Sequence, residues 1–367
     1  MKYFKKQLIS YLGNKRSLLS HIDNVIEEVK IDFNNPCKSS LDLFSGSGVV
    51  SRLLKTKCDS VITNDLELYA KTINDCFLYD LSSKEKEVLS RVFKQARIDI
   101  NFLLNSKYSS WVREYYAPKD ELNIQKNDRV FYTIRNARYL DCAVKVLNSI
   151  SEPYRSLLWG PLLSKASVHV NTAAMFKGFY KDKFTKLGKY GGTNSTDLDR
   201  IKKDIQLELP ILYQKNSFKS FNHQENANSL VNKLPIVDIA YLDPPYNQHP
   251  YASNYFMLNH LLEDKEPKEQ SIVVGIPKQW NRSNYNKKNK SVDTIIECIN
   301  KVKAKNIILS YSTSGFIKDK DVMISILKYA SGKDVRCVDI SYTNLSCGKT
   351  TKQSDKDKVC TEYLFVI

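Results

Sequence analysis

Asp243 and Tyr246 are the side chains whose types and spacing most directly suggest chemistry. They enclose two prolines in Asp243-Pro244-Pro245-Tyr246, directly after the apolar run Ile236–Leu242. The run predicts a buried strand, and the prolines end it because they have no backbone N–H to donate. A carboxylate and an aromatic ring are then held on a stiff turn at the carboxyl end of a strand, the edge at which α/β sheets bind ligands. The carboxylate can accept from an amino group and the ring can stack on a base; a tight loop without chemistry is the alternative.

A glycine-rich turn earlier in the chain predicts a second part of the same site. The segment Leu41–Leu54 has a short apolar run, then Gly46 and Gly48, then an apolar-periodic stretch, which predicts a strand, a tight turn and a helix. A second predicted strand, Ser60–Asp65, ends in an acid 19 residues after Gly46. In nucleoside-binding α/β folds an acid at this place binds the ribose hydroxyls. The series predicts a nucleoside-cofactor site, with a coincidental strand–helix–strand unit as the alternative.

The segment Tyr11–Leu19 contributes a cation. Gly13 and Asn14 suit a turn, so Lys15 stands at the start of a helix that is predicted to run through Val29. A positive charge is unusual there, because the helix dipole favours anions at that end. Lys15 is therefore a candidate to bind a ligand carboxylate, with a solvated loop lysine as the alternative.

Between about residues 71 and 204 the α/β alternation gives way to helical periodicity, for example at 84–104 and 135–150. Such a length exceeds a connection within a sheet, so we expect an inserted domain. Its most basic part, Lys177–Tyr190, holds five lysines and four aromatic residues. This composition suits contact with phosphates and stacking on bases, with a solvated loop as the alternative.

The α/β pattern resumes near Leu207. Further strands are predicted at 306–311, 335–342 and 361–367, and helices at about 253–263, 292–303 and 320–330. The run Lys278–Lys290 has five basic residues and no acid, which makes it a second candidate for phosphate contact.

The composition limits the class of protein. The 367 residues carry 56 Lys and Arg against 40 Asp and Glu, a net charge of +16 that favours a polyanionic partner, although lysine-rich codon usage would give the same excess. No apolar run is long enough for a membrane span, and the N-terminal residues lack the apolar stretch of a secretory signal. The eight cysteines are scattered without a C-x-x-C pair, so we expect reduced thiols, no metal site and a cytoplasmic location.

In this order the segments resemble the alpha-group DNA N6-adenine methyltransferases, the family of the Dam methylase. The resemblance covers nearly the whole chain and rests on Tyr11–Lys15, the Phe44-x-Gly46-x-Gly48 loop, Asn171-Thr172, the inserted segment, Asp243–Tyr246 with its extension to Tyr255, and Thr361–Phe365. It implies an α/β fold, a Rossmann-like class I S-adenosylmethionine-dependent methyltransferase sheet with a largely helical inserted target-recognition domain. The resemblance places the catalytic domain at 1–72 plus 205–367 and the inserted domain at 73–204.

The resemblance also implies roles for individual residues. Catalysis is expected of Asp243, Pro244, Pro245 and Tyr246. Binding of S-adenosylmethionine is expected of Tyr11, Lys15, Asp42, Phe44, Gly46, Gly48, Asp65, Asn226 and Asp243. Asn226 stands where the family has an acid that accepts from the adenine amino group of the cofactor. The DNA-binding candidates are Asn171, Lys177, Lys181, Lys183, Lys186, Lys189, Tyr190, Lys278 and Arg282.

The activity implied by the resemblance is methyl transfer to N6 of an adenine that is flipped out of double-stranded DNA, at a specific sequence and without a metal. A restriction-modification system is the expected setting, with a cognate restriction endonuclease as a further partner. Cytosine N4 and RNA adenine stay open as substrates of the same fold, although Asp rather than Ser at position 243 favours adenine. A DNA-binding module without catalysis is the remaining alternative, which the intact Asp243, Tyr246, Gly46 and Asp65 argue against.

Overall fold

The computed structural model describes residues 1–31, 36–266, 269–343 and 359–367. The chain divides into two compact units, each built from three segments. Unit 1 consists of Met1–Asn14, Glu67–Asn216 and Tyr251–Trp280, and unit 2 consists of Lys15–Leu66, Ser217–Pro250 and Asn281–Ile367.

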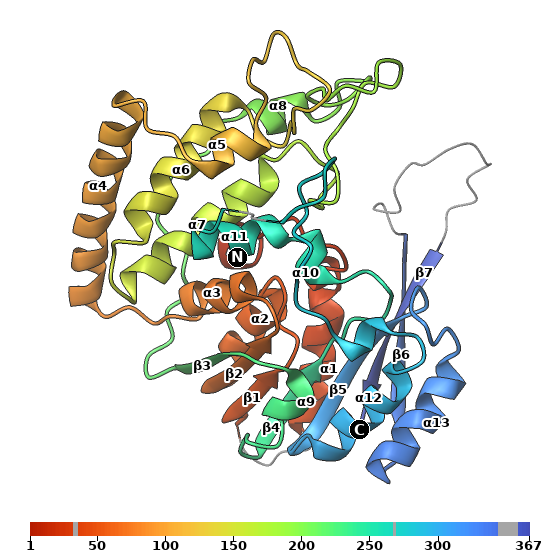
Figure 1. Ribbon diagram of the computed structural model, residues 1–367. Helices are drawn as coiled ribbons and strands as arrows, with labels where there is room; N and C mark the ends of the chain where they lie inside the picture. The colour runs from red at the N-terminus through yellow and green to blue at the C-terminus, as the bar shows by residue number, and fades with distance from the viewer. Residues whose placement is uncertain (32–35, 267–268, 344–358) are drawn as a thin grey trace. The chain divides into compact units, whose positions relative to one another are not determined.

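Unit 2 is built on a seven-stranded sheet (Figure 1). Its order is β3 (Lys219–Gln224), β2 (Ser60–Asp65), β1 (Ser39–Asp42), β4 (Val237–Leu242), β5 (Ala304–Ser312), β7 (Val359–Val366) and β6 (Arg336–Thr343). β7 runs antiparallel to both β5 and β6, and the other neighbouring strands are parallel. The α/β class and the Rossmann-like sheet that the sequence predicts are confirmed.

The burial of each strand explains its place in the sheet. All six residues of β4 are buried, as a central strand with both faces covered requires. At the edge of the sheet, β3 exposes Lys219, Phe221 and Gln224. Its sequence is mostly polar, so apolar patterning did not predict it as a strand. The helical elements of unit 2 are η2 (Lys15–Leu18), α1 (Leu19–Ile31), α2 (Val49–Lys57), α9 (Ala227–Leu230), η3 (Asn284–Asn286), α12 (Ser291–Lys301) and α13 (Lys320–Ser331).

The hydrophobic core of unit 2 joins the sheet to α12 and α13. Ile295 and Ile299 of α12 and Leu327 of α13 belong to one buried cluster with Ala240 of β4 and Leu309 of β5. The predicted helices 292–303 and 320–330 are thus confirmed to within two residues. Burial of one face of each helix fixes the strands whose ends carry the site described below.

Unit 1 is helical (Figure 1). Its elements are η1 (Lys2–Phe4), α3 (Leu68–Phe77), α4 (Ser83–Asn105), α5 (Trp111–Tyr116), α6 (Ile134–Leu147), α7 (Tyr154–Val168), α8 (Leu198–Lys202), α10 (Tyr251–Asn254) and α11 (Phe256–Glu263). The predicted helix 84–104 is confirmed as α4, which begins with a capping box of Ser82 and Glu85.

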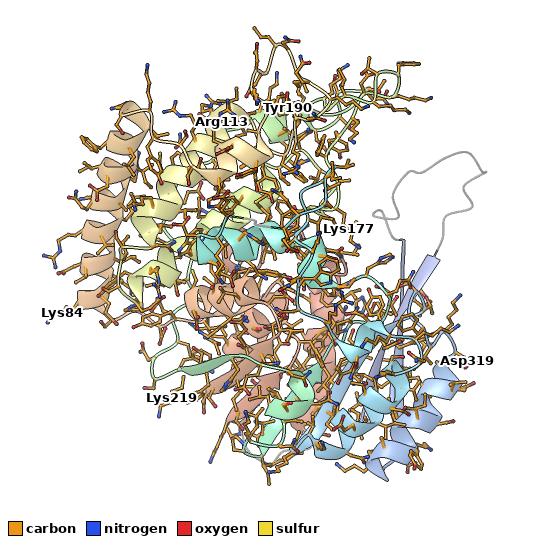
Figure 2. The ribbon with its side chains drawn as sticks, in the orientation of Figure 1. Lys84, Arg113, Lys177, Tyr190, Lys219 and Asp319 are labelled. Atoms are coloured by element: carbon orange, nitrogen blue, oxygen red, sulfur yellow. The ribbon has the colours of Figure 1, made fainter. Side chains whose placement is uncertain are left out.

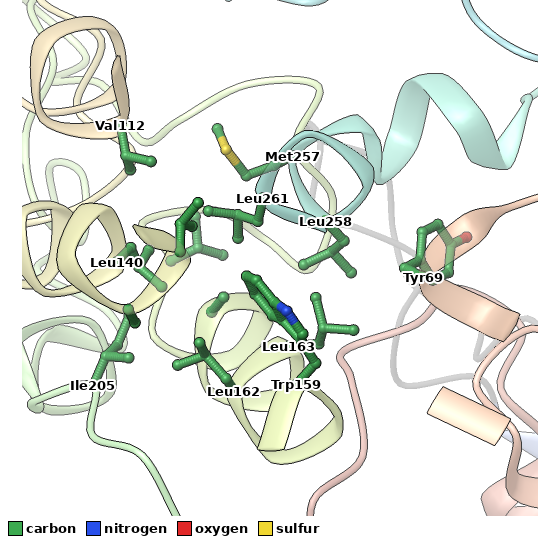
Figure 3. Packing of buried hydrophobic residues seen from close by; sticks show 14 of the residues in the cluster. Tyr69, Val112, Leu140, Trp159, Leu162, Leu163, Ile205, Met257, Leu258 and Leu261 are labelled. Atoms are coloured by element: carbon green, nitrogen blue, oxygen red, sulfur yellow. The ribbon is translucent and has the colours of Figure 1, made fainter. Parts of the chain in front are cut away.

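The core of unit 1 explains which segments it contains. Trp159 of α7 is 1% exposed and shares one buried cluster with Leu140 of α6 and Leu261 of α11 (Figure 3). Because α11 contributes core side chains here, residues 251–280 belong to the helical unit. The two units therefore differ from the expected boundaries of 1–72 with 205–367 and 73–204, since Met1–Asn14 and Tyr251–Trp280 are both part of unit 1.

Candidate active site

Three acids lie at the carboxyl edge of the sheet in unit 2. Asp42 ends β1, Asp65 ends β2, and Asp243 follows the last residue of β4. β1 is a parallel neighbour of both other strands, and Asp42 pairs in register with Tyr241 of β4 and Thr63 of β2. The register therefore brings the expected catalytic acid and two expected cofactor-binding acids to one edge of the sheet.

Asp243 forms a buried ion pair with Lys15. The Lys15 ammonium lies 2.8 Å from Asp243 Oδ2 and 3.3 Å from Glu362 Oε1, which also accepts a 2.6 Å hydrogen bond from the Ser310 hydroxyl. The side chains of Lys15 and Glu362 are only 4% and 1% exposed, so solvent screens these charges little. Asp243 Oδ1 is buried and has no hydrogen-bond partner in the part of the chain that the structure describes. Oδ2 of this carboxylate is thus held by Lys15, and Oδ1 can accept a hydrogen bond from a ligand.

The electrostatics of this cluster keep the lysine charged. Burial raises the pKa of the Asp243 carboxyl to about 6, with Lys15 opposing the rise and Glu362 adding to it. Burial would lower the pKa of the Lys15 ammonium, but the Asp243 and Glu362 carboxylates outweigh it and hold that pKa well above its usual value. Lys15 therefore acts on Asp243 in this structure, and its expected contact with a cofactor carboxylate stays a prediction.

Tyr246 places an aromatic ring beside Asp243. Its ring is half-buried, 5.8 Å from the ring of Tyr311 between centroids, and the Lys15 ammonium lies 5.9 Å from its centroid. Its backbone carbonyl accepts a 2.9 Å hydrogen bond from the Phe316 N–H, which ties the end of the turn to the segment after β5. Burial raises the pKa of the phenol to about 12, so Tyr246 is neutral and offers a ring, not a charge.

The glycine turn after β1 is tied to the end of β2. Gly46 and Gly48 have φ values of 49° and 73°, a left-handed conformation that disfavours other residues. Asp65 Oδ2 accepts a 2.8 Å hydrogen bond from the Gly46 N–H, so the acid at the tip of β2 is adjacent to the turn, as the sequence predicts. Phe44 is half-buried with its ring 5.1 Å from that of Tyr285, edge to face.

Asp42 is a buried acid at this edge. It is 1% exposed, and its Oδ2 accepts a 2.5 Å hydrogen bond from the Ser51 hydroxyl. Its Oδ1 has no partner within the described residues. Burial raises the pKa of the Asp42 carboxyl to about 7, the Ser51 hydrogen bond opposes this rise, and the negative charges of Asp243 and Asp65 add to it. Negative charge from Asp42, Asp65 and Asp243 at this edge of the sheet favours binding of a positively charged ligand.

Two further cofactor-binding candidates have defined surroundings. Asn226 is exposed at the start of α9, where its side-chain oxygen accepts a 3.3 Å hydrogen bond from the Ser229 N–H. Tyr11 belongs to unit 1, where its ring stacks on Tyr251 and Tyr255 at 4.9 Å from each. The roles of both toward a cofactor stay predictions.

The basic segment 177–190 forms a compact turn in unit 1. Lys181 and Gly188 make an antiparallel bridge, and Asp182 Oδ1 accepts from the N–H groups of Phe184 and Thr185. The exposed lysines are Lys181, Lys183, Lys186 and Lys189, and we call the segment 181–189 the basic turn. Phe184 at its tip is 81% exposed, which is unusual for a large apolar side chain.

Two DNA-binding candidates lie in the interior. Asn171 is 0% exposed; its amide nitrogen donates to the carbonyls of Val130 and Lys189, and its oxygen accepts from the Gly191 N–H. Tyr190 is 8% exposed and donates to the carbonyl of Tyr132. Their polar groups help to hold the basic turn in place, and their expected contact with DNA stays a prediction.

The remaining basic candidates divide between the two units. Lys177, labelled with Tyr190 in Figure 2, is half-buried, and burial lowers the pKa of its ammonium. Lys278 is exposed in unit 1, 3.7 Å from a Glu269 oxygen, and Arg282 is exposed in unit 2. The run that the sequence treats as one candidate therefore crosses from one unit to the other.

Glu362 is the site residue that the sequence analysis missed. It belongs to the predicted closing strand, where Tyr363, Leu364 and Phe365 follow it, and no role is expected of it. The available signal was an acid in a predicted strand that is otherwise rich in apolar residues. Such an acid is expected to be buried, and a buried carboxylate requires a partner.

The structure places limits on other kinds of site. No helix in the described ranges is long and apolar enough to span a membrane. Among the same residues, no group of three or more His, Cys, Asp or Glu side chains is arranged to hold a metal. Among the described residues, Cys37, Cys58, Cys76, Cys142, Cys298 and Cys337 are not joined in disulfides; Cys347 lies outside these residues.

Comparison with known proteins gives a consistent picture. The family model of the D12 class N6 adenine-specific DNA methyltransferases matches residues 11–324. The type II methyltransferase M.NlaIII of Neisseria lactamica is 29% identical over 98% of this chain and 99% of its own length. The type II methyltransferase M.CviAII of Paramecium bursaria Chlorella virus 1 is 25% identical over 88% of each chain. The modification methylase StsI of Streptococcus sanguinis is 27% identical over 97% of this chain, which spans 51% of that protein.

Proposed function

Because the chain belongs to the D12 class of N6 adenine-specific DNA methyltransferases, we propose that it transfers a methyl group from S-adenosylmethionine to adenine N6 at a specific sequence of double-stranded DNA. The observation that carries the catalytic part of this proposal is Asp243 Oδ1, a buried carboxylate oxygen without a partner among the described residues, at the carboxyl edge of the sheet. The half-buried ring of Tyr246 stands three residues away on the same turn.

Asp243 addresses the chemical difficulty of the reaction. The amino nitrogen of adenine is a poor nucleophile, because its lone pair is delocalised into the ring. Asp243 Oδ1 and the carbonyl of Pro244 can accept its two N–H hydrogen bonds and favour a pyramidal nitrogen that attacks. Asp243 must be ionised to do so, and its ion pair with the Lys15 ammonium favours the ionised form. Positioning and electrostatic stabilisation of this kind supply much of the rate enhancement of enzymes.

The chemistry of the sheet edge fits S-adenosylmethionine. Asp42 and Asp243 each have an oxygen without a partner in the described chain, and the Asp65 carboxylate adjoins the glycine turn. S-adenosylmethionine supplies an electrophilic methyl group on a positively charged sulfur. We assign the ribose hydroxyls to Asp65 and the methionine portion to the turn of Gly46 and Gly48, with Phe44 beside it and Tyr11, Lys15 and Asn226 as further contacts.

The DNA partner is assigned to the exposed cations. Lys181, Lys183, Lys186 and Lys189 of the basic turn present positive charge, and Phe184 at the tip presents an aromatic ring without burial. Cations contact phosphates while a ring stacks on a base, and a target adenine has to leave the duplex to be methylated. We propose that unit 1, which contains residues 73–204, recognises the target sequence, with Lys177, Lys278 and Arg282 as further phosphate contacts.

The setting of the reaction is proposed from the relatives. The three relatives are named type II methyltransferases or a modification methylase. We propose that this chain likewise modifies DNA in the cytoplasm as part of a restriction-modification system, where its product resists a cognate restriction endonuclease.

Tritiated methyl transfer tests the proposal. The protein is incubated with labelled S-adenosylmethionine and, in parallel, duplex DNA or RNA, and the nucleosides of the product are separated. Label in N6-methyldeoxyadenosine from duplex DNA is the expected result. Label in N4-methylcytosine, or in RNA alone, would contradict the proposed substrate. Loss of labelling in duplexes with single base-pair changes identifies the recognition sequence.

A further inference from the structure

Glu362 is a buried acid whose partners are both at the candidate site. Its side chain is 1% exposed, and a carboxylate that is buried without partners is strongly unfavourable. It accepts from the Ser310 hydroxyl at 2.6 Å and forms an ion pair with the Lys15 ammonium at 3.3 Å. The same Glu362 oxygen, Oε1, makes both contacts, so the carboxylate is directed at Lys15 by a second, neutral hydrogen bond.

The antiparallel direction of β7 brings Glu362 to this place. β4 and β5 are parallel, so their carboxyl ends lie at the site edge, where Asp243 follows β4. β7 runs in the opposite direction, and Glu362, near its beginning, pairs in register with Ser312 at the end of β5. An acid at the beginning of an antiparallel strand thus reaches the edge where the parallel strands end.

Lys15 connects the two acids. Its ammonium is 2.8 Å from Asp243 Oδ2 and 3.3 Å from Glu362 Oε1, and it is almost fully buried. A lysine side chain has a flexible stem, so one carboxylate partner would leave it free to swing. The second carboxylate, on a strand of the sheet, removes that freedom. Asp243 is consequently held through Oδ2, while Oδ1 keeps no partner among the described residues.

We propose that Glu362 is a positioning residue for methyl transfer, which anchors Lys15 so that Asp243 presents Oδ1 to the amino group of the target base. The proposal rests on the proposed function, because it concerns how the expected catalytic carboxylate is oriented. Glu362 itself does not contact substrate in this account and acts through Lys15.

The charges around Asp243 give this arrangement a measurable signature. Lys15 of η2 and Glu362 of β7 act electrostatically on Asp243, and the charge of Asp243 in turn affects Asp42 of β1, Tyr241 of β4 and Tyr246. Removing the negative charge of Glu362 lowers the pKa of Asp243, because Glu362 adds to the rise that burial causes. Removing the positive charge of Lys15 raises the same pKa. A residue with only a structural role would shift neither.

The test compares Glu362→Gln and Lys15→Met with the wild type. For each, kcat and KM for duplex DNA are measured from pH 5 to pH 9, and the affinity for S-adenosylmethionine is measured by calorimetry. We expect the acid limb of kcat to move to lower pH in Glu362→Gln and to higher pH in Lys15→Met, each by about one unit. We also expect kcat on the plateau to fall on the order of 10-fold in Glu362→Gln, with KM and cofactor affinity changed less than threefold.

Three results would overturn the inference. The first is a loss of activity in Glu362→Gln without movement of the acid limb. The second is movement of the limb in the same direction in both variants. The third is an acid limb that stays in place in Lys15→Met, since Lys15 would then not act on the ionisation of Asp243. Glu28→Gln, an exposed acid of the same unit that pairs with Arg336, is the matched control and leaves the profile unchanged.

The proposed function is checked separately in the same experiment. The nucleoside that wild-type enzyme labels shows whether adenine in duplex DNA is the substrate. If the labelled nucleoside is a different one, the proposed function fails, while the opposite movements of the acid limb still report whether Glu362 orients the reacting carboxylate.

Discussion

Asp42, Asp65 and Asp243 gather negative charge at the carboxyl edge of the sheet, and each does so with different partners. Asp65 accepts a backbone N–H, Asp42 accepts a hydroxyl and Asp243 is paired with a buried ammonium. Substitution of each acid by itself should therefore have a different effect on turnover, cofactor affinity and stability.

At Asp243 the expected loss is in turnover. Asp243→Asn keeps the size of the side chain but places an amide, half of it a donor, where an acceptor is required. We expect kcat for methyl transfer to duplex DNA to fall on the order of 100-fold or more, by analogy with the removal of one stabilising group from an active site. Affinity for S-adenosylmethionine, measured by calorimetry, should change little.

Asp65→Ala is the matched comparison and should give the opposite pattern. Removing a carboxylate that is assigned to the ribose hydroxyls weakens cofactor affinity, and turnover at saturating cofactor is largely kept. An Asp243→Asn enzyme that methylates at nearly the wild-type rate would refute the assigned role of Asp243. An unchanged cofactor affinity in Asp65→Ala would refute that of Asp65.

Asp42 gives a prediction about stability and pH. The pKa of its carboxyl is about 7 in the folded protein, above the value of about 3.9 for an unperturbed Asp. The folded state therefore binds the proton more tightly, and the stabilisation that follows is complete below about pH 4 and lost as pH rises through about 7. Above pH 7 the buried carboxylate destabilises the fold. Asp42→Asn should raise the melting temperature without ligand at pH 8, and the gain should shrink as pH is lowered to 5.

Asp238 of β4 is the control, because its effect on stability should change with pH in the opposite direction to that of Asp42. Burial would raise the pKa of its carboxyl, but the Lys305 ammonium and the N–H groups of Lys38 and Ser39 outweigh burial and hold that pKa below its usual value. Its contribution is present at neutral pH and lost on acidification, so Asp238→Asn should lower the melting temperature at pH 8. A gain in Asp42→Asn that is independent of pH would show that ionisation of Asp42 is not its cause.

At the scale of elements, the basic turn is a rigid support for exposed groups. Asn171, in the interior, donates to the Lys189 carbonyl at the end of the turn and accepts from the Gly191 N–H just after it. Asp182 accepts from the N–H groups of Phe184 and Thr185 at its tip. The sequence suggests a row of equivalent contacts, but the structure divides them into buried residues that hold the turn and exposed residues that can meet DNA.

The basic turn predicts a change in salt dependence. In a variant with Lys181, Lys183 and Lys186 all changed to Ala, fewer counterions are released on binding, because fewer phosphates are neutralised. The slope of log affinity for duplex DNA against log salt should become less steep by about 0.9 for each lost contact. Affinities are measured by fluorescence anisotropy over a range of salt concentrations.

Two variants show whether the effect belongs to the turn. Lys84→Ala removes an exposed lysine at the start of α4 (Figure 2) and should leave both affinity and slope unchanged. Phe184→Ala should weaken binding by roughly 1–3 kcal/mol of lost stacking without altering the slope, because no charge is removed. A triple variant with the wild-type slope would remove the basic turn from the proposed DNA contacts.

The packing of α3 on α7 gives a prediction for unit 1. A Cβ at Gly160 of α7 would lie 2.5 Å from Cys76 Sγ and 2.6 Å from Cys76 Cβ of α3. The two helices must move apart to accept it, so Gly160→Ala should destabilise the protein by roughly 1–3 kcal/mol. Urea unfolding followed by circular dichroism measures this. Gly178→Ala, where an added Cβ has nothing within 4 Å, should be close to neutral, and equal effects of the two variants would argue against a packing cause.

At the scale of the whole molecule, local patterns predicted the parts of the site that are contiguous in sequence. The Asp-Pro-Pro-Tyr turn after a buried strand and the glycine turn followed by Asp65 both depend on short-range features, namely missing N–H groups, positive φ values and apolar runs. The structure places Asp243 and the Gly46–Asp65 contact at one edge of one sheet, as parallel pairing requires.

What the sequence did not predict depends on pairing between distant segments. The contact of Glu362 with Lys15 requires that β7 enter the sheet in an antiparallel direction beside β5, and no local pattern specifies this neighbour. Burial of Asn171 likewise follows from loops that close around it. The place of residues 251–280 in the helical unit is set by packing of α11 against α7, which apolar periodicity alone does not assign.

The position of β7 also governs when the enzyme becomes active during its synthesis. The ribosome makes Lys15 early, the Asp243 turn much later and Glu362 last of the three. Among the described strands, β6 is hydrogen-bonded to β7 alone, so it cannot join the sheet beside β5 until β7 has been translated and inserted between them. A nascent chain can thus contain the Asp243 turn, to which we assign catalysis, before it contains Glu362, the acid that we propose orients it. We expect methylation to begin only after β7 has left the ribosome and has joined β5 and β6 in the sheet.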